Sequence, residues 1–279
     1  MKNFTDKVVV ITGAGSGIGQ ALAVDLAGRG ALLAISDIDE SGLAQTAERA
    51  RRAGARDVRT DRLDVADRAA FEAYANEIAA HFGRVNVVIN NAGVSLAGEL
   101  MELAWDDIDW LLGINFYGVL HGTKFFLPHL VDSGEGHLVN ISSLFGLISM
   151  ATQSIYNASK FAVRGLSEAV RQEMLMGGHQ VGVTVVHPGG IKTGIARSGR
   201  AGDPKEQAAF AKFFDERLAR TSAEKAAQVI IRGIERDQAR VLVGLDAHAI
   251  HNFGKFAGAR YQDVLAFGAS KVLPKRLRP

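Results

Sequence analysis

A tyrosine and a lysine four residues apart are the side chains in this chain best suited to acid–base chemistry. If Tyr156 and Lys160 lie on one helix, the i, i+4 spacing puts both on the same face. A phenol has a pKa near ~10, and a neighbouring ammonium favours the phenolate. A phenol tuned in this way can take up or return a proton at a bound molecule. Taken alone, the pair also fits a packed tyrosine beside a solvated lysine, so the surrounding residues must decide.

A glycine-rich turn follows the first strand-like run of the chain. After residues 8–12 come Gly13, Gly17 and Gly19, and then a helix that should begin near Gln20. Such a turn offers free N–H groups and the positive end of a helix dipole, which together bind pyrophosphate. The spacing does not match G-x-G-x-x-G in any register, but its place after the first strand is the one that a dinucleotide site requires. We predict a dinucleotide-binding turn; the alternative is a βα loop that binds no ligand.

An acidic residue ends the second predicted strand. Asp37 lies eighteen residues after Gly19, and a carboxylate at this place can accept both hydroxyls of an adenosine ribose. It would repel a 2′-phosphate, and no Lys or Arg stands between residues 36 and 41 to attract one. The pattern therefore predicts NAD, with NADP less favoured, although Asp37 could instead cap the next helix.

Short apolar runs alternate with segments of helical periodicity, which is typical of α/β folds. The predicted strands are Val8–Thr12, Leu32–Ser36, Val58–Leu63, Val85–Asn90, His137–Ile141, Val181–Val186 and Arg240–Val243. Their nearly continuous apolar character indicates a doubly wound, Rossmann-type fold, with a seven-stranded parallel sheet covered by helices on both faces. Residues 67–82 place apolar side chains along one helical face, with Asp67 as a plausible N-cap. We expect one domain over residues 1–244, including a partly helical lid over 189–221, and a C-terminal helical extension over 245–279.

Composition excludes several classes of protein. Apolar residues make up 47% and charged residues 22% of the 279 residues, as in ordinary globular proteins. The absence of Cys excludes a disulfide scaffold and a thiolate zinc site, and the eight His form no metal-binding pattern, so we predict no metal. No apolar run is long enough to span a membrane and no signal-peptide pattern is present, so we expect a cytoplasmic protein. The body of the chain is slightly acidic, which argues against nucleic-acid binding.

The order and spacing of several motifs resemble the short-chain dehydrogenase/reductase family, in its compact single-domain type. The resemblance covers nearly all of residues 5–244. The motifs that carry it are Thr12–Gly19, Asp64-Val65, Asn90-Asn91-Ala92-Gly93, Asn115 in INFYG, Ser142-Ser143, YNASK at 156–160, and Pro188-Gly189 followed by Thr193. The resemblance implies an oxidoreductase that transfers a hydride between NAD(H) and an alcohol or ketone.

The same resemblance implies a catalytic set. Tyr156 would act as general acid/base, and both the Lys160 ammonium and the positive charge of an oxidised nicotinamide would favour its phenolate form. Lys160 would also hydrogen-bond the nicotinamide ribose. Ser143 would hold the substrate oxygen; Ser142 is the neighbouring candidate, but the family's usual spacing to the tyrosine selects Ser143. Asn115 would hold a water that extends the proton relay, through its side chain or its backbone carbonyl; the alternative is local hydrogen bonding.

The remaining implied positions belong to the cofactor site. Asp64 would meet the adenine amino group, with the backbone or side chain of Val65 nearby, and Thr193 would contact the nicotinamide carboxamide. For Asn90, a structural role is nearly as well supported as a cofactor contact. The predicted cofactor-binding residues are Gly13, Ser16, Gly17, Ile18, Gly19, Asp37, Asp64, Val65, Asn91, Ala92, Gly93, Tyr156, Lys160, Pro188, Gly189, Ile191 and Thr193.

The segments expected to border the substrate are apolar and carry little fixed charge. They contribute Leu96, Phe145, Leu147, Met150, Phe210, Phe213 and Phe214. We therefore expect a small apolar secondary alcohol or ketone as substrate, although the lid phenylalanines could equally pack on the body. The alternative function is a catalytically silent dinucleotide sensor, which would be expected to lose Tyr156 or Lys160. A related lyase or dehalogenase would be expected to lose the glycines of the turn.

The end of the chain exceeds what the fold needs. Residues 247–279 carry six basic groups against Asp263 alone. The extension could cover the substrate site or a neighbouring subunit. Its basic end, with Lys271, Lys275, Arg276 and Arg278, could be a frayed terminus or, as a less favoured reading, touch an anionic membrane. The family resemblance implies a homo-oligomer, a dimer or a tetramer, formed through the helices that carry Asn115 and Tyr156.

Overall fold

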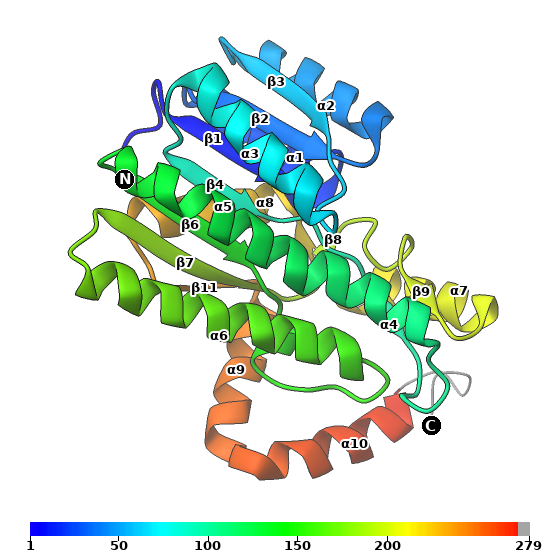
Figure 1. The fold of residues 1–279 in the computed structure, drawn as a ribbon. Coiled ribbons are helices and arrows are strands. Elements are labelled where there is room, and N and C mark those ends of the chain that lie inside the picture. The colour runs from blue at the N-terminus through cyan, green and yellow to red at the C-terminus, as the bar shows by residue number, and fades with distance from the viewer. Residues whose placement is uncertain (273–279) are drawn as a thin grey trace.

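The computed structural model describes residues 1–272 and contains one seven-stranded parallel sheet (Figure 1). Its strands are β1 (Val8–Thr12), β2 (Leu32–Asp37), β3 (Val58–Arg62), β4 (Val87–Asn90), β6 (Gly136–Ile141), β7 (Val181–Pro188) and β11 (Arg240–Val243). They lie in the order β11-β7-β6-β4-β1-β2-β3, and every pair of neighbours is parallel. The predicted doubly wound fold is confirmed, and most strand bounds differ from the prediction by one or two residues.

Helices cover both faces of the sheet. The helices are α1 (Gly17–Gly28), α2 (Glu40–Arg52), α3 (Arg68–Phe82), α4 (Trp105–Leu112), α5 (Gly118–Asp132), α6 (Ser154–Met176), α7 (Pro204–Phe213), α8 (Ala223–Glu235), α9 (Leu245–Ala257) and α10 (Tyr261–Val272). One buried apolar cluster joins α1, α2 and α8 to the sheet, and a second joins α3, α5 and α6. The helix predicted from residues 67–82 is present, and the Asp67 carboxylate accepts from the backbone N–H of Ala70 as its N-cap.

One strand departs from the apolar pattern because of its position. β3 is at the edge of the sheet, where Val58 is buried and the following side chains are half-buried or exposed. It therefore tolerates Arg59, Asp61 and Arg62, which a central strand covered on both faces would not.

The strand order places the candidate site. Successive strands run outward on one side from β1 to β2 and β3, and on the other from β4 to β6, β7 and β11. Ligands of such sheets bind beyond the carboxyl ends of the strands at this switch point, between β1 and β4. The turn after β1, the Asn-rich segment after β4 and Ser142-Ser143 after β6 all lie at this edge.

Residues 189–221 are partly helical, as predicted. They contain α7, a π-turn over Phe214–Leu218 and three short strands, β8 (Ile191–Lys192), β9 (Arg200–Ala201) and β10 (Thr221–Ser222). β8 pairs with β10, and β9 pairs with β5 (Leu96–Ala97).

The extension forms two helices that lie away from the sheet, beneath α6 in the view of Figure 1. The basic positions Lys275, Arg276 and Arg278, on which the membrane and frayed-end alternatives depend, lie outside the described residues. Within residues 1–272, no helix is long and apolar enough to cross a membrane.

Candidate active site

The glycine turn is shaped by close contacts that only glycine permits. Gly13 has φ +65°, and a Cβ there would lie 2.7 Å from the Cα of Ala92. A Cβ on Gly19, in the first turn of α1, would overlap the carbonyl oxygen of Gly13. The absent side chains thus let α1 begin directly against the end of β1, with its N-terminus at the sheet edge.

Two polar side chains tie this turn to the segment after β4. The Asn91 amide donates to the carbonyl oxygens of Thr12 and Gly13, both at 3.0 Å. The Thr12 hydroxyl in turn accepts from the backbone N–H groups of Asn91 and Ala92, at 3.1 and 3.2 Å. These hydrogen bonds therefore hold the end of β1 and the segment after β4, which belong to two distant motifs, side by side.

Asp37 lies over the glycine turn and does not cap a helix. Its Oδ2 accepts from the backbone N–H of Gly15 at 2.8 Å, and its Oδ1 accepts from that of Asp39 at 3.0 Å. The N-cap of α2 is Asp39, which accepts from Gly42 at 3.1 Å. The capping alternative for Asp37 is therefore wrong.

The segment after β7 returns to the same turn. A Cβ on Gly17 would lie 3.0 Å from the Cγ2 of Thr193, so these two predicted cofactor residues are in contact. Between β7 and Thr193, the backbone N–H of Gly189 donates to Val243, and Ile191 is buried in β8. Ser16, by contrast, is exposed as the N-cap of α1, and its hydroxyl makes no capping hydrogen bond.

Two predicted residues lie apart from this cluster. Asp64 and Val65 follow β3, two strands away from β1. Asp64 is exposed, and its carboxylate accepts from the backbone N–H of Ala66 at 2.9 Å. Val65 is buried against Gly118 of α5, and its carbonyl accepts from the His121 ring at 3.0 Å. Their contact with the adenine of a bound dinucleotide, which the resemblance implies, stays a prediction.

Tyr156 and Lys160 lie buried on one face of α6, next to the loop that follows β6. Tyr156 is 9% exposed and Lys160 is 3% exposed. The Lys160 ammonium lies 5.7 Å from the centroid of the Tyr156 ring and donates to the Ile141 carbonyl at 3.2 Å. Phe145 packs edge-on against the tyrosine ring, with centroids 6.2 Å apart. The shared helical face expected from the spacing is thus present.

The two serines after β6 have different surroundings. The Ser142 hydroxyl donates to the backbone carbonyl of Lys160 at 2.8 Å, which holds α6 against the strand end. The Ser143 hydroxyl accepts from the N–H of Phe145 at 3.1 Å, and it lies close enough to the Tyr156 hydroxyl to lower the pKa of the phenol. Of the two, Ser143 is the one whose hydroxyl faces the phenol.

Burial shifts the protonation of both site groups toward neutrality. It raises the pKa of Tyr156, and the hydrogen bond from Ser143 acts in the opposite direction but does not prevail. It lowers the pKa of Lys160 to about 8. The expectation that the Lys160 ammonium and an oxidised nicotinamide together favour the phenolate stays a prediction, since the shift described here is that of the protein's own groups, with desolvation of Tyr156 as its largest cause.

Asn115 occupies a wide turn between two helices. Residues Gly113–Tyr117 form a π-turn that joins α4 to α5, so the predicted long helix is continuous but locally expanded. The side chain is fully buried: its amide donates to the Val94 carbonyl at 2.9 Å and its Oδ1 accepts from the Val94 N–H at 2.8 Å. A Cβ on Gly93 would lie 3.2 Å from Asn115 Oδ1 and 3.4 Å from Lys160 Nζ, so the three residues meet.

Comparisons with known proteins agree with this geometry. The family model for short chain dehydrogenases matches residues 7–204. The chain belongs to the short-chain dehydrogenase/reductase family. "Putative oxidoreductase SadH" of Mycobacterium tuberculosis (strain ATCC 25618 / H37Rv) is 52% identical over 274 residues, covering 98% of this chain and 99% of its own. "Meso-2,3-butanediol dehydrogenase" of Serratia marcescens is 35% identical over 225 residues, covering 75% of this chain and 87% of its own.

A solved family member carries a ligand. The crystal structure of a short-chain dehydrogenase/reductase from Burkholderia phymatum in complex with NAD has a TM-score of 0.86 and 31% identity, and the match covers 94% of this chain and 97% of that chain. The family and this neighbour support an oxidoreductase that uses a nicotinamide dinucleotide. The chain's own residues fit such a group: a glycine turn that leads into the N-terminus of α1, Asp37 above the turn, and Thr193 beside Gly17.

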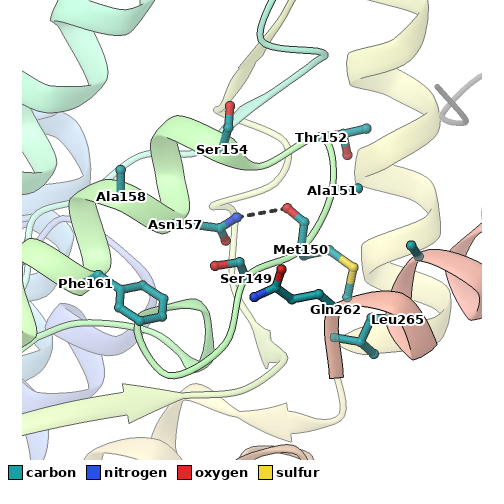
Figure 2. Close-up of a pocket in the computed structure, with 11 residues that line it drawn as sticks. Ser149, Met150, Ala151, Thr152, Ser154, Asn157, Ala158, Phe161, Gln262 and Leu265 are labelled. Atoms are coloured by element: carbon teal, nitrogen blue, oxygen red, sulfur yellow. Dashed lines mark hydrogen bonds between the residues drawn. The ribbon is translucent and has the colours of Figure 1, made fainter. Parts of the chain in front are cut away.

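In this short-chain dehydrogenase/reductase, two residues that were expected near the substrate line cavities beside the C-terminal helices instead. Met150 lines a cavity of about 580 Å³ between α10 and the face of α6 that carries Asn157, Ala158 and Phe161 (Figure 2). Successive helical residues turn by about 100°, so this is the face opposite Tyr156. Leu147 lines a smaller cavity of about 160 Å³ against α9. The loop after Ser143 thus turns these side chains away from the phenol.

One residue that holds the site, His187, was not found by sequence reasoning, and the structure decides between the two roles considered for Asn90. His187 is fully buried, and burial lowers its pKa to about 4, so the ring is neutral and donates from Nδ1 to the Ser143 carbonyl at 2.7 Å. Asn90 donates to the Asn140 side chain at 2.8 Å inside the sheet, which favours its structural role. The His-Pro-Gly order around 187–189 was the available signal for His187, but nothing in one sequence shows its partner.

Proposed function

We propose that this chain is an NAD-dependent dehydrogenase/reductase that transfers a hydride between NAD(H) and an apolar secondary alcohol or ketone. The observation that carries the proposal is the burial of Tyr156, Lys160 and the Ser143 hydroxyl in one cluster at the sheet edge that also holds the glycine turn. Among the described residues no carboxylate pairs with Lys160, and a buried ammonium without such a partner is costly to the fold, so such groups occur where function needs them.

Each side chain has a distinct task in this proposal. The bound nicotinamide supplies the acceptor or donor of the hydride. Tyr156 takes the hydroxyl proton of the alcohol, or gives a proton to the ketone oxygen in the reverse direction. Ser143 holds that oxygen beside the phenol. Lys160 favours the phenolate and orients the nicotinamide ribose.

The proton relay proposed for Asn115 uses its backbone carbonyl. Both ends of its side-chain amide already bond to Val94, so of the two alternatives the carbonyl is the better supported. The π-turn around Asn115 changes the local hydrogen-bond register, which is a common way for a helix to offer a carbonyl to a ligand or water.

The preference for NAD rests on Asp37. Its carboxylate lies at the turn, where it can accept ribose hydroxyls and would repel a 2′-phosphate. Arg62 is the register partner of Asp37 across the β2–β3 ladder, so a cation stands one strand away. The preference therefore depends on the carboxylate more than on an absence of positive charge.

The apolar substrate class is supported by the surroundings of the phenol. Tyr156 packs in a cluster with buried Leu96 and Leu111 and with partly buried Val94, Leu103 and Phe145. The relative named meso-2,3-butanediol dehydrogenase has, by its name, a secondary alcohol as substrate. The lid role of residues 189–221, the single domain over 1–244 and assembly through α5 and α6 into a dimer or tetramer remain parts of the proposal.

A panel of secondary alcohols and ketones, assayed by nicotinamide absorbance with NAD(H) and NADP(H), tests the function. We expect turnover of apolar substrates and a higher kcat/KM with NAD(H). NADH binding without turnover of any member would support the silent sensor instead. Failure to bind either dinucleotide would overturn the proposal.

A further inference from the structure

The C-terminal extension touches both loops that border the candidate site. One is the Pro188–Gly190 loop, which begins at the last residue of β7; the other, residues 147–153, leads from the turn after Ser143 to α6. The Asp246 carboxylate accepts from the backbone N–H of Gly190 at 2.6 Å. The Tyr261 hydroxyl accepts from the backbone N–H of Ser149 at 3.0 Å. Between these anchors, α9 packs on the second loop so closely that a Cβ on Gly254 would lie 2.8 Å from Ile148 Cγ2.

In the described part of the chain, Asp246 provides the one side chain that hydrogen-bonds the backbone of Gly189 and Gly190. The other bonds run from Gly189 N–H to the Val243 carbonyl and from the N–H groups of Arg220 and Thr221 to the Gly190 carbonyl. A hydrogen bond to an ionised carboxylate is stronger than these neutral ones. A Cβ on Gly189 would overlap the Asp246 carboxylate, so the loop and the first turn of α9 are in direct contact.

The hydrogen bond between Tyr261 and Ser149 joins α10 to the 147–153 loop beside a space that is otherwise open. Figure 2 shows Gln262 and Leu265 of α10 on one side of the cavity of about 580 Å³, and Ser149, Asn157 and Phe161 on the other. Because this space separates α10 from α6, close packing does not hold the helix there. The hydroxyl of Tyr261 at the start of α10 therefore fixes the position of the 147–153 loop more than the packing of α10 does.

We propose that the extension is a two-point brace of the active site. Asp246 positions the Pro188–Gly190 loop against the nicotinamide end of the cofactor, and Tyr261 positions the 147–153 loop against the substrate. Both are positioning residues, since neither is argued to touch cofactor or substrate. The inference rests on the function proposed above.

Binding measurements without turnover test the Asp246 anchor. NADH is compared with ADP-ribose, which has the same adenine end but no nicotinamide. We expect Asp246→Ala to weaken NADH binding about tenfold, in line with the loss of one charge-assisted hydrogen bond, and to leave ADP-ribose affinity within about twofold. Asp246→Asn keeps an accepting oxygen and should recover most of the NADH affinity. Asp263→Asn, an exposed carboxylate on α10, is the matched control and should bind both ligands like the wild type.

The outcomes of these binding measurements distinguish a failure of the proposed brace from a failure of the proposed function. Equal weakening of NADH and ADP-ribose would indicate general loosening of the fold and overturn the brace, as would unchanged binding of both in Asp246→Ala. Wild-type protein that binds ADP-ribose but not NADH would instead contradict the proposed function. If Asp246→Ala does not fold, Asp246→Ser takes its place: its hydroxyl is one bond shorter than the carboxylate and should not reach the Gly190 N–H, so NADH binding should again weaken while ADP-ribose binding does not.

Tyr261→Phe tests the second anchor, because it removes only the hydroxyl. With the substrate that the wild type turns over best, we expect KM to rise or kcat to fall about fivefold, on the scale of one neutral hydrogen bond, while NADH affinity stays unchanged. Phe256→Ala is the control, since this aromatic side chain of α9 is 93% exposed. Wild-type kinetics in Tyr261→Phe, or loss of NADH affinity, would overturn the role assigned to this residue.

Discussion

Replacing Lys160 by Met should make the protein more stable at neutral pH while removing its activity. Burial lowers the pKa of Lys160 from 10.5 to about 8. At about 1.4 kcal/mol per pKa unit, this burial of the ammonium costs the folded state about 3 kcal/mol at pH 7. Methionine removes that cost but loses the hydrogen bond to the Ile141 carbonyl, worth about 1 kcal/mol. The variant should therefore gain about 2 kcal/mol in free energy of unfolding.

The direction of the Lys160 pKa shift determines how the stability advantage of Lys160→Met changes with pH. The unfolded lysine keeps its proton up to about pH 10.5, whereas the folded one releases it above about pH 8. The cost is fully present below pH 8 and disappears as the pH rises to 10.5. The advantage of Lys160→Met should thus fall from about 2 kcal/mol at pH 7 to below zero near pH 10.5, where only the lost hydrogen bond remains.

Urea unfolding at pH 7 and at pH 10 measures this difference. Lys124→Met, on the exposed side of α5, is the control, and its small effect should not change with pH in the same way. Hydride transfer by Lys160→Met should fall at least about a hundredfold, the usual scale for a lost acid–base partner. The reasoning is refuted if the variant is less stable than the wild type at pH 7, or if the stability difference is the same at both pH values.

Three further changes test the rest of the site. Tyr156→Phe should lose turnover by at least about a hundredfold yet bind NADH almost as well as the wild type, because the ring and its edge contact with Phe145 remain. Loss of NADH affinity in equilibrium binding would show that its role is misassigned. Asp37→Ala should lower the ratio of kcat/KM for NAD over NADP, since Arg62 then lacks an opposing carboxylate; an unchanged ratio would remove Asp37 from the account of specificity. Deletion of residues 270–279 should leave steady-state rates unchanged, because Asp246 and Tyr261 precede the deletion; lost activity with the oligomer intact by light scattering would place the tail at the active site.

The sequence predicts those parts of the site that depend on local spacing and strand order. Tyr156 and Lys160 share a helical face because of their spacing alone. The glycine turn and Asp37 come to one edge because consecutive parallel strands end there. These features need no knowledge of distant contacts, which is why one sequence is sufficient for them.

Features that depend on partners far along the chain could not be predicted. The hydrogen bond between Asp246 and Gly190 joins segments that no motif links. The π-turn at Asn115 depends on how α4 and α5 meet the Val94 backbone, and helical periodicity does not reveal it. The direction of the Tyr156 pKa shift was also beyond reach, because desolvation depends on how completely the ring is enclosed.

The raised pKa of Tyr156 connects the protonation state of this residue with the direction of hydride transfer. With the protein's own groups alone, burial keeps the phenol protonated, which is the form that gives a proton to a ketone oxygen. The phenolate that alcohol oxidation requires needs a further positive charge nearby. The oxidised nicotinamide of NAD carries such a charge, and the reduced ring of NADH does not. If the dinucleotide binds as proposed, each redox form therefore favours the protonation state of Tyr156 that its own direction of reaction uses.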